Sequence, residues 1–148
     1  IGWHVVETPS ALQGAADELS LYAGESYWTG EGSALRRYTL RLDGFVSAHA
    51  PMQGGGLVTK PVKFDGNALH LNFATSAAGG VRVELQDPSG SPIPGFALDD
   101  CAPLFGDTVD RLVAWKTGSD VSKLSGQPVR LRFELKDADL YAFQFVDA

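Results

Sequence analysis

The chain has 148 residues, of which 44% are hydrophobic and 20% charged, and its formal net charge is −6. This length suits one ordinary domain, and the composition excludes a disordered chain. No apolar run in the sequence approaches the ~20 residues that span a bilayer as a helix, and an acidic chain without clustered Lys and Arg is poorly suited to a phosphate backbone. We therefore expect neither a membrane nor a nucleic acid as partner.

Cys101 is the only cysteine, so the sequence excludes an intrachain disulfide. A single cysteine fits the cytoplasm, and it also fits a secreted protein whose hydrophobic core is sufficient for stability. The sequence begins at Ile1 without Met, a basic region or an apolar signal segment. We therefore expect it to be a piece of a longer or processed polypeptide.

The first predicted elements are short. We expect a strand over residues 3–6, a weakly patterned region over 9–17 in which Ser10 caps a turn of helix, and a second strand over 19–22. A Gly-rich stretch with aromatic residues follows over 23–32 and predicts a loop.

The run over residues 35–48 predicts a long strand with an interruption. Tyr38, Leu40 and Leu42 share one parity, and Asp43-Gly44 then breaks the alternation, which indicates a bulge or tight turn. Residues 51–56 predict a loop, because three consecutive glycines leave its backbone unusually free.

Two clear alternations lie in the middle of the chain. Residues 69–73 and 81–85 each alternate apolar with polar or small side chains, and a period of two with one apolar face predicts a half-buried strand. A turn over 76–80 is expected between them. The other elements predicted here are short strands over 57–59 and 62–64 and turns over 65–67 and 87–90.

The last third predicts an irregular crossover over 92–104, a strand over 111–115 and a helical turn over 119–124 capped by Ser119 or Asp120. Two strands then follow. Val129, Leu131, Phe133 and Leu135 should form one buried face, and Trp115, Tyr141, Phe143 and Phe145 should also lie in the core. About ten strands at roughly 8–12-residue spacing predict an all-β fold, an antiparallel β-sandwich of jelly-roll type.

Several motifs occur together in the order L-R-R-Y-T-L-R-L-D-G-F-V-S, V-T-K-P, F-A-T-S-A-A-G, I-P-G-F-A-L-D-D-C, W-K-T-G-S-D-V-S and V-R-L-R-F-E-L-K-D-A-D-L-Y-A-F-Q-F. Over residues 18–145 the chain resembles the C-terminal β-sandwich domain of bacterial glycoside hydrolases whose propeller is like those of families 32 and 43. The segment E-L-S-L-Y-A-G-E-S-Y-W is similar to the tail of that propeller.

The resemblance implies a domain organisation and a location. Residues 1–34 would be an N-terminal segment left from a preceding propeller, and residues 35–148 would be the β-sandwich domain. A catalytic domain would be covalently linked in the full-length protein, and the blades that carry its catalytic carboxylates would lie outside this chain. Such a bacterial protein would be secreted or periplasmic.

Catalysis by this chain itself is not expected. Glycoside hydrolysis needs two carboxyl groups about 5 Å or about 6.5–9.5 Å apart. Aspartates are available, but aspartate in loops more often forms turns or ion pairs. The three histidines have no metal-ligand spacing, and the sequence holds no nucleophile elbow or phosphate-binding loop. The candidate acids are Asp99, Asp100, Asp107, Asp110, Asp137 and Asp139, and the histidines are His4, His49 and His70.

No cofactor is expected, with one alternative left open. Asp99, Asp100 and Asp107 lie in or near the long crossover, and carboxylates with loop carbonyls suit a structural calcium ion. Ordinary surface turn chemistry is the favoured interpretation of these aspartates.

Aromatic side chains carry the binding hypothesis. Sugar rings present apolar C–H faces that stack on Trp and Tyr, and their hydroxyls need polar partners. Tyr27 and Trp28 are adjacent in the Gly-rich stretch, where strand burial does not explain them, and Trp3 completes the candidate ligand-binding set. The equally weighted alternative is that the pair plugs the sandwich or faces a neighbouring domain.

The sequence thus supports a non-catalytic carbohydrate-binding or accessory module of a glycoside hydrolase. It would bind a polysaccharide or oligosaccharide by stacking and hydrogen bonds and raise the effective concentration of the linked enzyme. The alternative is a structural domain that buttresses a catalytic propeller and binds no glycan. A small independent enzyme is the least favoured hypothesis.

Overall fold

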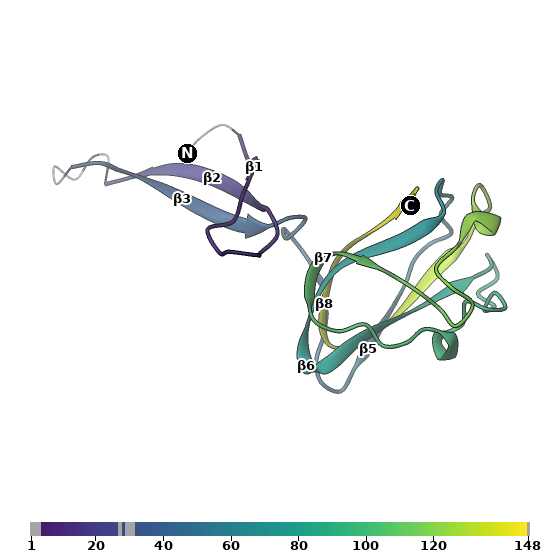
Figure 1. Ribbon diagram of the computed structural model, residues 1–148. Helices are drawn as coiled ribbons and strands as arrows, with labels where there is room; N and C mark the ends of the chain where they lie inside the picture. The colour runs from purple at the N-terminus through teal and green to yellow at the C-terminus, as the bar shows by residue number, and fades with distance from the viewer. Residues whose placement is uncertain (1–3, 27, 29–31, 148) are drawn as a thin grey trace. The chain divides into compact units, whose positions relative to one another are not determined.

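The computed structural model describes residues 4–26, 28 and 32–147, and the chain divides into two compact units, Ile1–Phe45 and Val46–Ala148. We call these unit 1 and unit 2. Their described strands pair antiparallel throughout, which confirms the all-β class (Figure 1). The jelly-roll sandwich stays a prediction.

Unit 1 is a three-stranded sheet in the order β1 (Val6–Thr8), β2 (Glu18–Glu25) and β3 (Ala34–Arg41). β2 and β3 pair along their whole length. This pairing explains why the units divide after Phe45 rather than at the predicted 34/35 boundary, since a cut there would part β3 from β2.

The start of unit 1 differs locally from the prediction. The first described strand begins at Val6, where a strand over 3–6 was expected. No helical turn forms among the described residues 9–17, although the Ser10 hydroxyl accepts the Leu12 N–H at 3.2 Å, as a cap would. The predicted break at Asp43-Gly44 is confirmed, with Asp43 at φ 56°.

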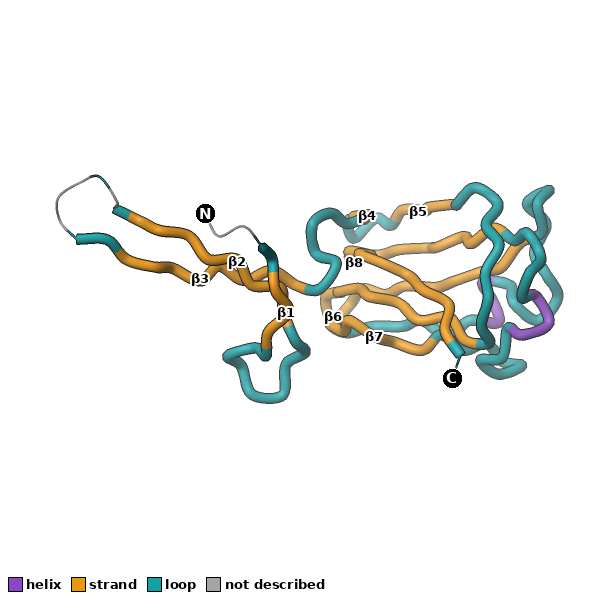
Figure 2. The backbone as a smooth tube through the Cα atoms, turned by 90° about the horizontal axis from the view of Figure 1, so that it is seen from above, coloured by secondary structure: helices purple, strands orange, loops and turns teal. Residues whose placement is uncertain are grey.

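Unit 2 is a five-stranded sheet built on two long strands, β6 (Ala68–Gln86) and β8 (Arg130–Val146), which lie side by side (Figure 2). β7 (Asp107–Leu112) pairs with the other edge of β6. β4 (Ala48–Ala50) and β5 (Gly55–Val58) pair with successive parts of the free edge of β8.

The predicted turn over 76–80 is wrong, because β6 runs through it without reversing. Its pairing with β8 shifts between Thr75 and Gly80, opposite Asp137, which has φ 41°. A Cβ added at Gly79 would lie 2.5 Å from the Asp137 carbonyl oxygen, so only glycine fits there. The small residues therefore serve a bulge at which the sheet curls, rather than a turn.

Because the sheet curls, both ends of β6 contribute to one core. The buried cluster joins Leu69, Leu71 and Phe73 with Val81 and the rest of the second half. The predicted face is confirmed: Val129, just before β8, and Leu131, Phe133 and Leu135 on β8 are all at most 2% exposed.

The other predicted core aromatics are placed as follows. Trp115 is 4% exposed and donates its indole N–H to the Val83 carbonyl at 2.9 Å. Tyr141, Phe143 and Phe145 are half-buried, and the Phe145 ring stacks on Phe64 with centroids 3.7 Å apart.

The connections follow predicted turn chemistry. The helical turn predicted over 119–124 forms as a 3₁₀ turn, η2 (Ser122–Leu124), whose N-cap is Val121 rather than Ser119 or Asp120. The Asp120 carboxylate, one residue earlier, accepts the N–H of Ser122 at 2.8 Å. The crossover over 92–104 is irregular and contains a second 3₁₀ turn, η1 (Leu98–Asp100). It returns to the sheet where Val81 and Leu104 exchange main-chain hydrogen bonds.

Candidate functional site

Of the three predicted ligand-binding aromatics, Trp28 is described by the structure. It lies between β2 and β3 and is 90% exposed. Trp3 and Tyr27 lie outside the described residues. The structure therefore gives the position of one member of the set and does not test the set as a stacking platform.

A second feature of unit 1 is an apolar sheet face, which we define by Leu19 and Leu21 on β2 and by Tyr38 and Leu40 on β3. Leu19 lies opposite Leu40 and Leu21 opposite Tyr38, so all four point to one side of the sheet. Tyr38 and Leu40 are 45% and 37% exposed. With Val5, Thr39 and Phe45 they line a shallow concavity of about 120 Å³.

One end of the apolar face is marked by a polar contact. The Tyr38 hydroxyl donates to Glu25 at 2.6 Å, and this hydrogen bond raises the pKa of Tyr38 above its ordinary value. Arg36 pairs with the other oxygen of the same carboxylate at 2.9 Å. Polar groups thus satisfy one another at the rim and leave the centre of the face apolar.

The opposite face of the same sheet is held by Arg37. Its guanidinium donates to the hydroxyls of Ser20 and Thr8, both at 2.7 Å, and to the Glu18 carboxylate at 2.8 Å. The Pro9 carbonyl accepts a further bond at 3.1 Å. This network links all three strands by hydrogen bonds rather than by packing.

Ser20 is also the one buried residue among the described residues of unit 1. A sheet usually gains its stability by burying one apolar face against another layer. In unit 1 the apolar face is open and the buried position is polar, so the described part of the unit has no hydrophobic core of its own.

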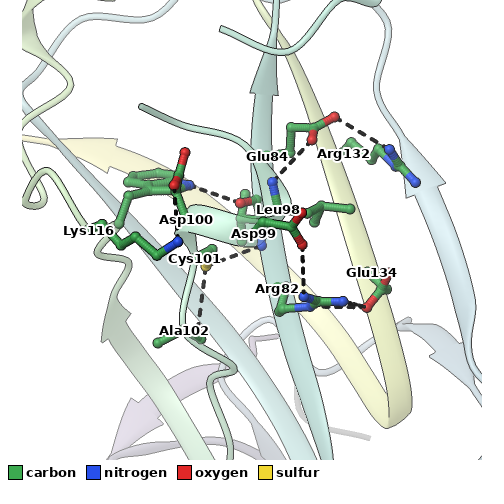
Figure 3. A network of polar contacts seen from close by, with 12 residues as sticks. Arg82, Glu84, Leu98, Asp99, Asp100, Cys101, Ala102, Lys116, Arg132 and Glu134 are labelled. Atoms are coloured by element: carbon green, nitrogen blue, oxygen red, sulfur yellow. Dashed lines mark hydrogen bonds and ion pairs between the residues drawn. The ribbon is translucent and has the colours of Figure 1, made fainter. Parts of the chain in front are cut away.

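In unit 2 a buried carboxylate belongs to Glu84, which lies on the outer face of β6 and, like Asn72, is 3% exposed (Figure 3). It accepts the Leu98 main-chain N–H at 3.1 Å and the Gln86 side-chain amide at 2.7 Å. Arg132, directly opposite on β8, approaches it to 3.5 Å. Glu84 therefore ties η1 of the crossover to the sheet.

In the next cross-strand pair the positions of the acid and the arginine are exchanged between the two strands. Arg82 on β6 lies opposite Glu134 on β8 and donates to its carboxylate through Nε, at 3.1 Å, and Nη2. The hydrogen bond to Glu134 raises the pKa of Arg82. Asp99, whose side chain is 97% exposed, lies 3.8 Å from the same guanidinium.

Strand alternation does not reveal this network, because its members alternate with core residues on β6 and β8 and were expected on a solvent face. The available signal was the complementary order Arg82, Glu84 against Arg132, Glu134, which an antiparallel pairing brings opposite each other.

Cys101 follows η1 and is buried. Its Sγ accepts the Val83 N–H at 3.4 Å, and burial raises the pKa of its thiol. A buried thiol with a raised pKa is a poor nucleophile, because the thiolate is the reactive form.

The aspartates considered for calcium do not form one site. Asp99 faces Arg82, and Asp100 pairs with Lys116 at 3.4 Å. Asp107 lies on β7 opposite Ala74. Within residues 4–26, 28 and 32–147, no three His, Cys, Asp or Glu side chains are grouped so that they could hold a metal ion.

Two of the histidines form pairs with aspartates. His70 Nδ1 lies 2.5 Å from the carboxylate of Asp110, and His49 Nδ1 lies 3.1 Å from that of Asp139. Ser47 donates to the same Asp139 oxygen at 2.7 Å. Since Ser47 and His49 both bind the aspartate and not each other, this is not the relay of a hydrolytic triad.

The chain matches no protein-family model, no curated protein and no solved structure in the three comparisons made. Its described helical segments are also too short to cross a membrane.

Proposed function

We propose that the chain is a non-catalytic accessory segment of a larger carbohydrate-active protein, in which unit 1 docks onto a neighbouring β-sheet domain. The observation that supports this most directly is the combination in unit 1 of an open apolar face with a single buried residue, Ser20, among those described. The resemblance to the domain beside a glycoside hydrolase propeller agrees with it. The proposal includes a jelly-roll sandwich for unit 2 and a secreted or periplasmic location.

The docking partner follows from the shape and chemistry of the apolar face. Strand side chains projecting from a sheet pack well against a second sheet about 10 Å away. Leu19, Leu21 and Leu40 carry no polar atoms in their side chains. Their apolar surface is stabilised by contact with another apolar surface, and neither water nor a charged partner provides that contact. An apolar sheet of the linked domain matches the apolar face of unit 1 in both shape and chemistry.

The engaged carboxylates support a non-catalytic role. Glu84 and Glu134 both accept bonds from other side chains or from the main chain, and each lies beside an arginine. A glycosidase acid needs a carboxyl group that is free to deliver a proton to the leaving group. These two carboxylates instead hold strands and the crossover together.

Hydrogen–deuterium exchange tests the docking. We expect main-chain amides of β2 and β3 to exchange rapidly in the 148-residue chain and slowly in a polypeptide that also carries the linked domain. Amides of β6 and β8 should be protected in both samples and serve as the internal reference. Equal protection of β2 and β3 in the two samples would contradict the proposal.

A matched pair of substitutions locates the contact. Leu21→Lys places a charge on the apolar face and should abolish the added protection in the longer polypeptide. Leu35→Lys is its control, because Leu35 has the opposite parity on β3 and is 75% exposed. Loss of protection with both variants would show that the sheet is destabilised rather than undocked.

Glycan binding is the second candidate, and the 90% exposure of Trp28 favours it. An exposed indole can stack on the apolar face of a sugar ring. Retention of the chain on a polysaccharide affinity gel would support this candidate. The two candidates are compatible, because Trp28 lies outside the apolar face as defined above.

A further inference from the structure

The outer face of β8 carries two adjoining hollows that the docking of unit 1 does not use. One, of about 610 Å³, lies between β8 and the segment 52–56, and its polar side chains are Gln53, Arg132, Glu134 and Lys136. The other, of about 290 Å³, lies toward β6 and is lined by residues 78–80, Arg82 and Pro103. Both include Glu134, Leu135 and Lys136, so together they form one shallow groove across β5, β8 and β6.

Two glycines keep this groove open. Gly56 lies opposite Glu134 and Gly80 lies opposite Lys136, so a side chain at either position would project into the groove. Neither glycine has a left-handed φ, and a Cβ at either would meet its neighbours at 3.5 Å or more. Glycine weakens a strand, and at Gly56 no bulge requires it, so its effect there is to let another molecule approach the backbone. Gly80 also borders the bulge that follows Thr75.

The polar groups of the groove are partly fixed in advance. Arg82 is held by Glu134, and Arg132 lies beside the buried Glu84. The Lys136 side chain is exposed and makes no ion pair with the described residues. The groove therefore offers one cation without an ion-pair partner among the described residues, beside donors and an acceptor that are already oriented.

We infer that this groove binds an oligosaccharide that carries carboxylate groups. A ring carboxylate would pair with the Lys136 ammonium, and ring hydroxyls would use Gln53, Arg132 and Glu134, which supply both donors and an acceptor. The larger hollow lies within the size range of small-ligand sites. The choice of a sugar as ligand rests on the proposed carbohydrate-active role, but not on the docking of unit 1, and it places glycan contact away from Trp28.

Isothermal titration of the whole 148-residue chain with tri-galacturonic acid at low salt tests the inference. We expect binding that weakens as salt is added, and no binding of the neutral trisaccharide of the same linkage. Lys136→Met should weaken binding at least about tenfold, as expected for loss of a charge-assisted hydrogen bond. Lys123→Met, which removes the same charge outside the groove, should bind as the parent does.

A steric variant separates the groove from general charge attraction. Gly56→Leu should abolish binding while the thermal melt stays cooperative, and Trp28→Ala should leave the affinity unchanged. If Gly56→Leu does not fold, Gln53→Leu on the exposed loop replaces it, with at least about fivefold weaker binding expected. The inference is overturned if the parent chain does not bind, or if Lys136→Met or the steric variant binds as well as the parent does. It is also overturned if a sulfated trisaccharide or tri-glutamate binds as tightly as tri-galacturonic acid.

Discussion

Glu84 and Leu98 are joined by a hydrogen bond of 3.1 Å between a buried carboxylate and the first main-chain N–H of η1. The two residues belong to the long strand β6 and to the crossover beside it, so this bond fixes an irregular segment that has little regular structure of its own. The Gln86 amide binds the other oxygen of the same carboxylate at 2.7 Å.

Glu84→Ala should therefore destabilise unit 2 by roughly 2–4 kcal/mol, because it leaves the Leu98 N–H and the Gln86 amide without their acceptor in a buried place. Urea denaturation of both proteins measures the difference. Glu134→Ala is the control and should cost less than about 1 kcal/mol, since the Glu134 side chain is 45% exposed. Equal costs for the two substitutions would contradict a special role for the buried carboxylate.

This role could not be predicted from the sequence, because burial of Glu84 depends on a crossover that is distant along the chain. Strand alternation correctly placed Val83 in the core and also placed Glu84 on the other face. It did not show that Leu98 would cover that other face. By contrast, the loop position of Trp28 followed from local composition, and the structure places Trp28 in a turn between β2 and β3.

The prediction of buried residues was most accurate where pairing is regular. From Val129 to Leu135 no bulge interrupts β8, and every predicted residue is buried. Beyond Asp137 the buried parity changes to Ala138 and Leu140, and another register shift follows near Tyr141. Because each inserted residue reverses the face of those after it, alternation alone cannot follow a strand through two bulges.

Phe133→Ala should lower the free energy of unfolding by roughly 3–5 kcal/mol, because the side chain is fully buried and its removal leaves a cavity. The ring also packs against Phe143, with centroids 5.6 Å apart. Phe105→Ala is the matched control, since Phe105 is 67% exposed, and should change stability by less than about 0.5 kcal/mol. An unchanged denaturation midpoint for Phe133→Ala would show that the assigned core face is wrong.

Asp87 should make the stability of unit 2 dependent on acid pH. Its carboxylate accepts the Ser89 hydroxyl at 2.5 Å and the Ser91 N–H at 3.0 Å, and these bonds, the hydroxyl first, lower the pKa of Asp87 below its ordinary 3.8. A lowered folded-state pKa means that the stabilisation is present above the unfolded value and is lost as pH falls through the folded value.

Thermal melts of the parent and of Asp87→Asn, taken from about pH 6 to about pH 2, measure this contribution. The parent should have the higher melting temperature at about pH 6. The difference in melting temperature between the two proteins should become smaller as the pH falls below the ordinary aspartate pKa. The same substitution at Asp99, which is 97% exposed and outside the turn, should change the melting temperature only slightly. If the difference in melting temperature between the parent and Asp87→Asn is constant over this pH range, Asp87 does not make the predicted pH-dependent contribution.

Substitution of Trp28 separates glycan stacking from a structural role of this side chain. If the chain is retained on a polysaccharide and Trp28 stacks on the sugar, Trp28→Ala should lose ~1–3 kcal/mol of affinity, by analogy with base stacking on aromatic side chains. The melt should not change, because an indole that is 90% exposed contributes little to packing. Trp115→Phe is the opposite control: it removes the buried indole bond to Val83 and should lower the melting temperature without acting on glycan affinity. Calorimetry and melts on the same samples decide between the outcomes. Undiminished binding by Trp28→Ala removes Trp28 from any glycan site, whereas lost binding together with a collapsed melt identifies it as a structural plug.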